Sequence, residues 1–157
     1  MLARPIQLGL LVAACALLLT GPAAAAKPSQ REASILAAVN GARKAHDLQP
    51  LLIDAKLMRV ADGYSATLLR QDVLTHGNFA QRMRSSGARG PRFGENLAWG
   101  TGPYATARSI VTSWLRSPGH RANLLRPGFR RIGIGARVGS FAGHRGAVVV
   151  TADFAGT

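Results

Sequence analysis

Three polar residues stand at breaks in the helical pattern, beside apolar or glycine neighbours. They are His76 in LTHGNF, Glu95 in FGENLAWG and His120 in SPGHRANLL. Two imidazoles and one carboxylate are a sufficient ligand set for a divalent transition metal, with an open position for water. The same groups can instead act as acid and base, with Glu95 fixing a histidine tautomer. A single histidine at a helix end more often bonds a backbone carbonyl, so the three residues form a site only if the fold brings them together.

Helices are predicted first along the chain. Ser29 and Glu32 form an S-x-x-E capping box, followed by apolar residues at helical spacing. Asp54 is placed to cap a second helix, and the short helical segment AQRMRSSG ends at Gly87. Residues 88–103 are rich in glycine and proline, and we expect a loop there.

The second half of the chain changes from a helix to strands. Pro103 suits the first turn of a helix that carries Trp114, and we expect Pro118 and Gly119 to end that helix and turn His120 toward the other candidates. RRIGIGARV and GAVVVTADF have the pattern of strands, joined as a hairpin through GSFAGH. Helices first and strands last favour an α+β domain. Trp99 and Trp114 are both predicted to lie in the core.

The chain of 157 residues suits one domain preceded by an export signal. Residues 1–26 have the three parts of a signal peptide: Arg4, an apolar run, and the small-residue segment GPAAAA. We therefore predict a signal peptide over 1–26 and a mature domain over 27–157, secreted, periplasmic or held at the cell envelope. Cys15 lies in a lipobox-like VAAC, but the apolar run continues past it, so we favour ordinary cleavage over a lipoprotein.

The composition is strongly basic, with a formal net charge of +13 that falls to +12 once Arg4 is removed with the leader. Such a charge attracts anionic surfaces such as lipid head groups, acidic polysaccharides or nucleic acid, although it also suits a plain solvated surface. No segment interleaves basic residues with exposed aromatic residues, so we expect no specific nucleic-acid partner. The pattern carries no indication of an oligomeric state.

Four ordered motifs, HGNFAQRM, GENLAWG, SWLRSPGHRANLL and RIGIGARV, together resemble the CAP superfamily. This superfamily comprises the cysteine-rich secretory proteins, antigen 5 and the plant pathogenesis-related proteins of group 1. The likeness covers residues 31–156 and is greatest to bacterial members that consist of one such domain. It implies a three-layer α-β-α sandwich with a central antiparallel sheet.

The resemblance also implies a cleft lined by two histidines and two acidic residues. Carried over by position, these are His76, Glu95 and His120, while the second acid of W-x-x-E is Ser117 here. A hydroxyl lacks the full charge of a carboxylate, so we expect any zinc or other divalent cation at His76 and His120 to bind reversibly rather than permanently. Asn96 and Asn123 are expected to hold the surrounding loops through backbone groups.

The residues leave several functions open. We favour a non-catalytic binding domain, with no required cofactor, whose cleft holds a lipid, a glycan, another anionic component of the cell envelope or a partner protein. The alternative is a metal-assisted hydrolase or protease that uses His76, Glu95 and His120, although neither G-x-S-x-G nor H-E-x-x-H is present. Asp153, near the end of the last strand, is open to two interpretations: a salt bridge to an arginine, or a place in the cleft.

Overall fold

The computed structural model describes residues 27–156, so the predicted signal peptide and Cys15 lie outside the described residues. Its helices are α1 (Gln30–Lys44), α2 (Ala55–Gln71), α3 (Phe79–Ser86), the 3-10 helix η1 (Gly102–Ala105), α4 (Ala107–Arg116) and α5 (Pro118–Leu124). Its strands are β1 (Leu52–Ile53), β2 (Phe93–Gly100), β3 (Phe129–Phe141) and β4 (His144–Gly156). Within 27–156, no helix has the length and apolar character needed to span a bilayer.

The four strands form one sheet in the order β1-β3-β4-β2. The predicted hairpin is confirmed, with longer strands and a tighter turn than expected: β3 and β4 pair antiparallel and turn at Ala142 and Gly143. Both turn residues have positive φ, 49° and 77°, which matches the right-handed twist of a two-residue hairpin. β2 pairs antiparallel with β4, and the short β1 pairs parallel with β3.

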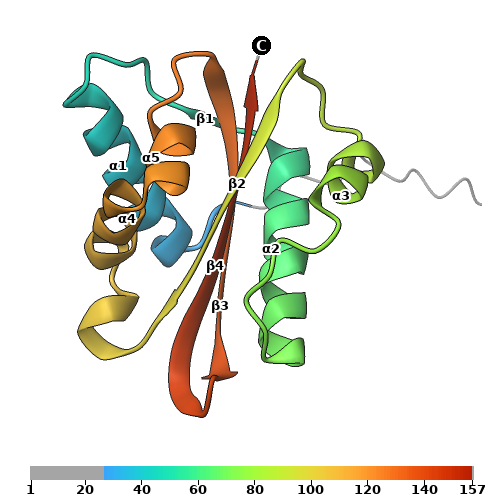
Figure 1. The fold of residues 1–157 in the computed structure, drawn as a ribbon, viewed down its shortest axis with the longest axis vertical. Coiled ribbons are helices and arrows are strands. Elements are labelled where there is room, and N and C mark those ends of the chain that lie inside the picture. The colour runs from blue at the N-terminus through green and yellow to red at the C-terminus, as the bar shows by residue number, and fades with distance from the viewer. Residues whose placement is uncertain (1–26, 157) are drawn as a thin grey trace, which may run out of the picture.

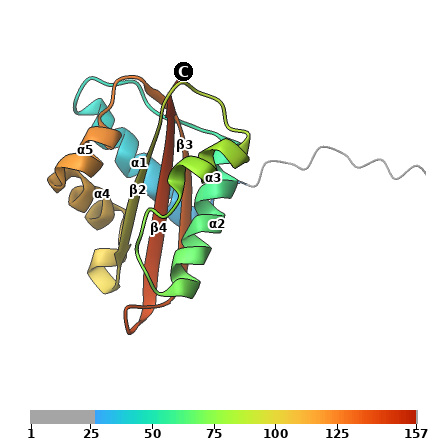
Figure 2. The same cartoon turned by 45° about the vertical axis from the view of Figure 1, so that its right-hand side comes forward.

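Helices cover both faces of the sheet (Figure 1). α1, α4 and α5 lie on one face, and α2 and α3 lie on the other, as the rotated view also shows (Figure 2). Close packing of α2 on β3 depends on Gly133, where an added Cβ would lie 2.0 Å from the carbonyl carbon of Leu57. The predicted three-layer α-β-α sandwich is confirmed, and its sheet is antiparallel except for the β1-β3 pair.

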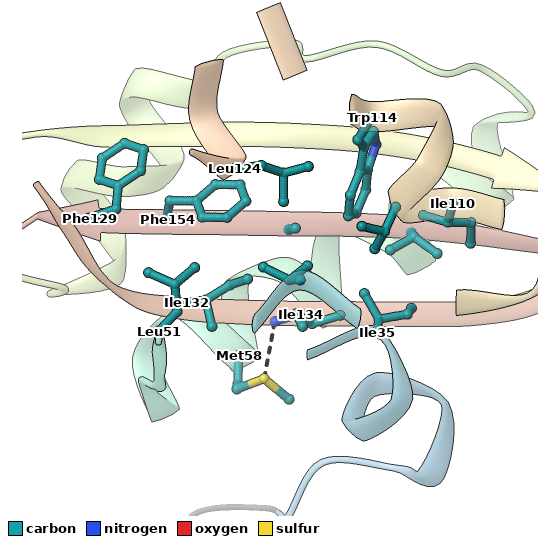
Figure 3. Packing of buried hydrophobic residues seen from close by; sticks show 14 of the residues in the cluster. Ile35, Leu51, Met58, Ile110, Trp114, Leu124, Phe129, Ile132, Ile134 and Phe154 are labelled. Atoms are coloured by element: carbon teal, nitrogen blue, oxygen red, sulfur yellow. Dashed lines mark hydrogen bonds between the residues drawn. The ribbon is translucent and has the colours of Figure 1, made fainter. Parts of the chain in front are cut away.

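The main core lies largely between the sheet and the α1, α4 and α5 layer (Figure 3). Phe129 and Phe154 stack with ring centroids 5.6 Å apart, and Trp114 is buried with its indole N–H donating to the carbonyl of Leu97 at 2.9 Å. Trp114 is therefore a core residue, as predicted. The same prediction is wrong for Trp99, which is 37% exposed near the end of β2.

The predicted helix starts are confirmed by their caps. Ser29 and Glu32 form both bonds of the capping box, and the Asp54 carboxylate accepts from the N–H groups at the start of α2. Gly87, in the left-handed region, ends α3 as expected.

One local expectation is wrong. Residues 93–100 were predicted to lie in a loop but form β2. Their glycines suggested a loop, whereas in the structure they allow other chain segments to approach the strand closely. A Cβ at Gly100 would lie 2.4 Å from the carbonyl oxygen of Tyr104. The helix that carries Trp114 ends before Pro118 as expected, since α4 stops at Arg116. Pro118 occupies the first turn of a new helix, α5, where its missing N–H costs nothing, so His120 lies on a helix.

One arginine ties the α5 segment to α1. Arg43, in the last turn of α1, is fully buried, although its position suggests a surface residue. Its guanidinium donates to the carbonyls of Gln49, Leu124, Arg126 and Phe129. These bonds fix the connection between α5 and β3, and therefore the end of the helix that carries His120.

Candidate functional site

The four predicted site residues come from three parts of the fold. His76 lies between α2 and α3, Glu95 is on β2, Ser117 joins α4 to α5, and His120 is in the first turns of α5. β2 is an edge strand, so segments of both helical layers can reach around it.

Glu95 is the centre of the His76 half of the site. Its side chain is 1% exposed, and its Oε1 lies 2.7 Å from Nδ1 of His76. Its other oxygen, Oε2, forms an ion pair with Arg82 of α3. An ionised carboxylate only accepts hydrogen bonds, so Nδ1 must carry a proton. In the neutral ring Nε2 then has the free lone pair, and the predicted role of Glu95 in fixing a tautomer agrees with this geometry.

Arg82 and Tyr64 hold the His76 loop in place. Arg82 donates to the carbonyl of His76 at 2.8 Å, and its guanidinium lies over the Tyr64 ring, 3.2 Å from the ring centroid. The Tyr64 hydroxyl donates to the carbonyl of Thr75 at 2.7 Å. Gly77 has a φ of 47°, and a Cβ there would lie 2.8 Å from that hydroxyl, so the loop requires glycine.

Amides hold the His120 half. Asn96 donates to the carbonyl of His120 at 3.0 Å, while Asn123 donates to the carbonyl of Glu95 at 3.1 Å and to the Asn96 side chain at 3.0 Å. The predicted backbone-binding roles of both asparagines are confirmed. Burial lowers the pKa of His120, and the nearby His76 lowers it further. The two imidazoles come from segments on opposite faces of the sheet, and a charge on His76 disfavours a proton on His120.

Ser117 is half-buried and takes no part in this network. Its backbone lies at the end of α4 and the start of α5, but its hydroxyl makes no capping hydrogen bond to α5. A serine acts as a nucleophile only when a base accepts its proton, and no described hydrogen bond joins Ser117 to a histidine.

Asp153 lies opposite Glu95 in the sheet, because the two are register partners of β4 and β2. The side chain is fully buried, and neither carboxylate oxygen has a hydrogen-bond donor. Burial raises the pKa of the Asp153 carboxyl well above its usual range, and the Glu95 charge raises it further against the opposing effect of Arg82. Of the two interpretations left open, a salt bridge to an arginine is therefore wrong.

The donor set does not fit a three-ligand metal centre. Both oxygens of Glu95 are already engaged by His76 and Arg82. Across the part of the chain that the structure describes, no three histidine, cysteine, aspartate or glutamate side chains are grouped so that they could hold a metal ion. A reversible zinc site at His76 and His120 stays a prediction, as does the cleft implied by the resemblance.

Sequence reasoning missed Arg82 and Tyr64. A signal for Arg82 was available, because a carboxylate buried on a strand requires a compensating charge. The sequence contains many arginines, however, and spacing alone could not select the one on α3 that lies beside Glu95.

Comparisons with known proteins bear on the family and the fold of the chain. The family model described as the cysteine-rich secretory protein family, CAP, matches residues 36–154. The chain belongs to this family. The match includes every residue of the site, from His76 to Asp153, and the CAP fold accounts for the order of the helices and strands.

Two bacterial proteins show how this CAP domain occurs in longer chains. The uncharacterized protein YkwD of Bacillus subtilis is 31% identical over 121 residues, which are 74% of this chain and 46% of that protein. An extracellular protein from Bacillus anthracis that contains an SCP domain has a solved structure with a TM-score of 0.65 and 25% identity, covering 78% of this chain and 39% of that one. The chain thus spans less than half the length of these two relatives.

A third relative is of similar size to this domain. An outer surface protein of Borrelia burgdorferi has a solved structure with a TM-score of 0.63 at 24% identity, covering 78% of this chain and 90% of that one. At this identity the likeness shows the fold alone.

Proposed function

We propose that this CAP domain is a secreted, non-catalytic binding domain whose ligand contacts His76 and His120. The observation that carries the proposal is the commitment of Glu95 to two internal partners. With its side chain 1% exposed and both oxygens engaged, Glu95 serves to orient His76 rather than to accept a proton from a substrate. His76, by contrast, keeps 56% of its side chain exposed and can present Nε2 to a ligand.

The same geometry disfavours the alternative of a metal-assisted hydrolase. Such an enzyme needs a metal held by several ligands or an activated nucleophile, together with a base that can reach the substrate. Glu95 is withdrawn from both the metal-ligand and the base role by its partners, and Ser117 supplies a hydroxyl where many family members have a second acid.

The ligand we propose is an anionic component of the cell envelope. The charge of +12 on the mature chain attracts anions over a distance of about one Debye length, roughly 8 Å at physiological salt. A protonated imidazole carries an N–H on both nitrogens, so Nε2 of His76 can then donate to a phosphate or carboxylate oxygen at short range. Export is supported by the leader-like N-terminal sequence and by the similarity to a protein described as extracellular.

The test compares two pairs of histidines in the same chain. His46 and His144 are exposed and lie outside the site, so the double variant His46→Ala/His144→Ala is a matched control for His76→Ala/His120→Ala. Binding to vesicles of phosphatidylglycerol, with phosphatidylcholine vesicles as the neutral reference, is measured by sedimentation at low and physiological salt. We expect the site variant to lose at least tenfold in affinity and the control to stay near wild type.

Two results would contradict the proposal. Equal losses in both double variants would assign binding to general charge and not to the site. Hydrolysis of a peptide and ester panel by wild type, absent from a folded His76→Ala/His120→Ala variant, would establish the hydrolase alternative instead.

A further inference from the structure

Asp153 is a buried acid that neither the orientation of His76 nor the proposed ligand contact explains. It stands on the central strand β4, fully buried, with no donor to either oxygen. An unpaired carboxylate in such a place is strongly unfavourable, since burial without a partner removes its hydration. The position next to Glu95 makes a second negative charge still less favourable.

The surroundings of Asp153 decide which of the two acids carries a proton. Glu95 receives the positive charge of Arg82 and the N–H of His76, and both stabilise its ionised form. Asp153 forms a hydrogen bond with neither Arg82 nor His76. A single proton shared between the two acids is therefore placed on Asp153.

A proton on Asp153 also supplies the partner that its buried oxygens otherwise lack. As two carboxylates, Asp153 and Glu95 have no proton between them, and the Asp153 oxygens are left without a partner. With one proton the same contact becomes a hydrogen bond between the side chains, and this bond is one of the causes that raise the pKa of Asp153. The buried acid is then satisfied without any donor from elsewhere.

We propose that Asp153 is a neutral carboxylic acid that donates a hydrogen bond to Glu95, and that it acts as a positioning residue for His76. Glu95 then accepts from three groups, His76, Arg82 and Asp153, which is within the capacity of a carboxylate. Held on three sides, Glu95 keeps its charge and its orientation, and His76 keeps its proton on Nδ1 and its lone pair on Nε2.

The other groups around the pair are consistent with this assignment. Both acids act electrostatically on Tyr64 of α2. Burial raises the pKa of Tyr64, Glu95 and Asp153 raise it further, and Arg82 opposes the rise. On the same face of β4, the Thr151 hydroxyl bonds to Ser65 of α2 at 2.9 Å and adds no charge. Arg82 is therefore the positive group that faces the pair, and one proton on Asp153 leaves Arg82 balanced by one carboxylate.

The contribution of Asp153 to ligand binding through His76 rests on the function proposed above. The hydrogen bond from Asp153 to Glu95 does not depend on that function. Carbon-detected NMR of the ¹³C-labelled mature domain reads the protonation of the Asp153 carboxyl directly during a titration from pH 3 to 9. We expect the Asp153 signal to remain that of the acid at about pH 5, where an ordinary aspartate is ionised. A carboxylate signal for Asp153 at that pH overturns the proposal.

The positioning role needs a second readout, which is the tautomer of His76 seen by ¹⁵N NMR of the ring. In Asp153→Asn the amide can still donate to Glu95, so we expect His76 to keep its proton on Nδ1 as in wild type. In Asp153→Leu the donor is gone, and we expect a mixture of the two tautomers. An unchanged His76 signal in a folded Asp153→Leu variant overturns the positioning role.

Glu95→Gln tests the shared proton by a second route, whether or not Asp153→Leu folds. A glutamine at 95 removes the charge that favours a proton on Asp153, so the Asp153 titration must move toward lower pH, and an unmoved titration overturns the proposal. Failure of vesicle binding, with the Asp153 and His76 signals as expected, would instead contradict the proposed function and leave the acid pair standing.

Discussion

Replacing Arg82 by methionine tests the electrostatic centre of the site. Methionine keeps an unbranched apolar chain that can lie on Tyr64, but it removes the charge that pairs with Glu95. Breaking a buried ion pair by removing one partner costs about 3–5 kcal/mol, because the remaining charge stays buried. Glu95 is 1% exposed, yet His76 still donates to it and Arg82 keeps 19% of its side chain exposed. We therefore expect a loss near the lower end, about 3 kcal/mol in the free energy of unfolding.

Urea unfolding at pH 7, followed by circular dichroism, measures this loss. Arg84 lies on the same helix and is exposed, so Arg84→Met is the matched control, with an expected change of less than about 0.5 kcal/mol. The double variant Arg82→Met/Glu95→Gln should recover part of the stability, because the uncompensated carboxylate is gone. A loss below about 1 kcal/mol, or one equal to that of Arg84→Met, would refute the inference that Arg82 neutralises a buried charge.

Three further changes probe the framework around the site. Gly133→Ala would place a methyl group 2.0 Å from the backbone of Leu57, so we expect the variant to be unfolded by circular dichroism, whereas Gly119→Ala, which meets nothing within 4 Å, should fold. Arg43→Met leaves four carbonyls without their donor and should lower the free energy of unfolding by at least about 3 kcal/mol in urea, unlike Lys44→Met beside it. Because the pKa of His120 is lowered in the folded protein, the unfolded chain binds a proton at this histidine more readily than the folded chain. Protonation of His120 therefore does not reduce stability above about pH 6.5, and it lowers the free energy of unfolding as the pH falls from there toward the folded pKa. Urea series from pH 8 to 5 should show a steeper loss for wild type than for His120→Gln, and parallel curves would contradict the burial of His120.

Local signals in the sequence predicted much of the fold. The capping box of Ser29, the cap at Asp54 and the stop at Gly87 each depend on neighbouring residues, and all three are present in the structure. The strand β2 was missed because its glycines look like loop residues when considered alone. They are required by contacts with η1 and with Asn123, which are distant in sequence, so no local pattern could reveal them.

The site residues also fall into those that local sequence signals predicted and those that depend on contacts distant in sequence. His76, Glu95 and His120 were found because they interrupt helical patterns, and the family resemblance placed them together. Arg82 and Tyr64 had no such signal, and Asp153 was noticed without its neighbour Glu95 being identified. The roles of these residues arise from the register of β2 on β4 and the packing of α3 beside them. Ser117 was placed by motif alone and lies outside the hydrogen-bond network that the structure describes around Glu95.

Glu95 and Asn96 are consecutive residues of β2, and their alternation explains how helices on both faces of the sheet can contribute to one site. Successive side chains of a strand point to opposite faces of its sheet, so Glu95 reaches the α3 layer while Asn96 reaches the α5 layer. One residue orients His76 and the next holds the segment of His120. Because β2 lies at the edge of the sheet, the segments that carry the two histidines both lie beside this strand, on its opposite faces. A slip of β2 by one residue would exchange the faces of Glu95 and Asn96 and separate both histidines from their partners, so the register with β4 specifies the site as well as the sheet.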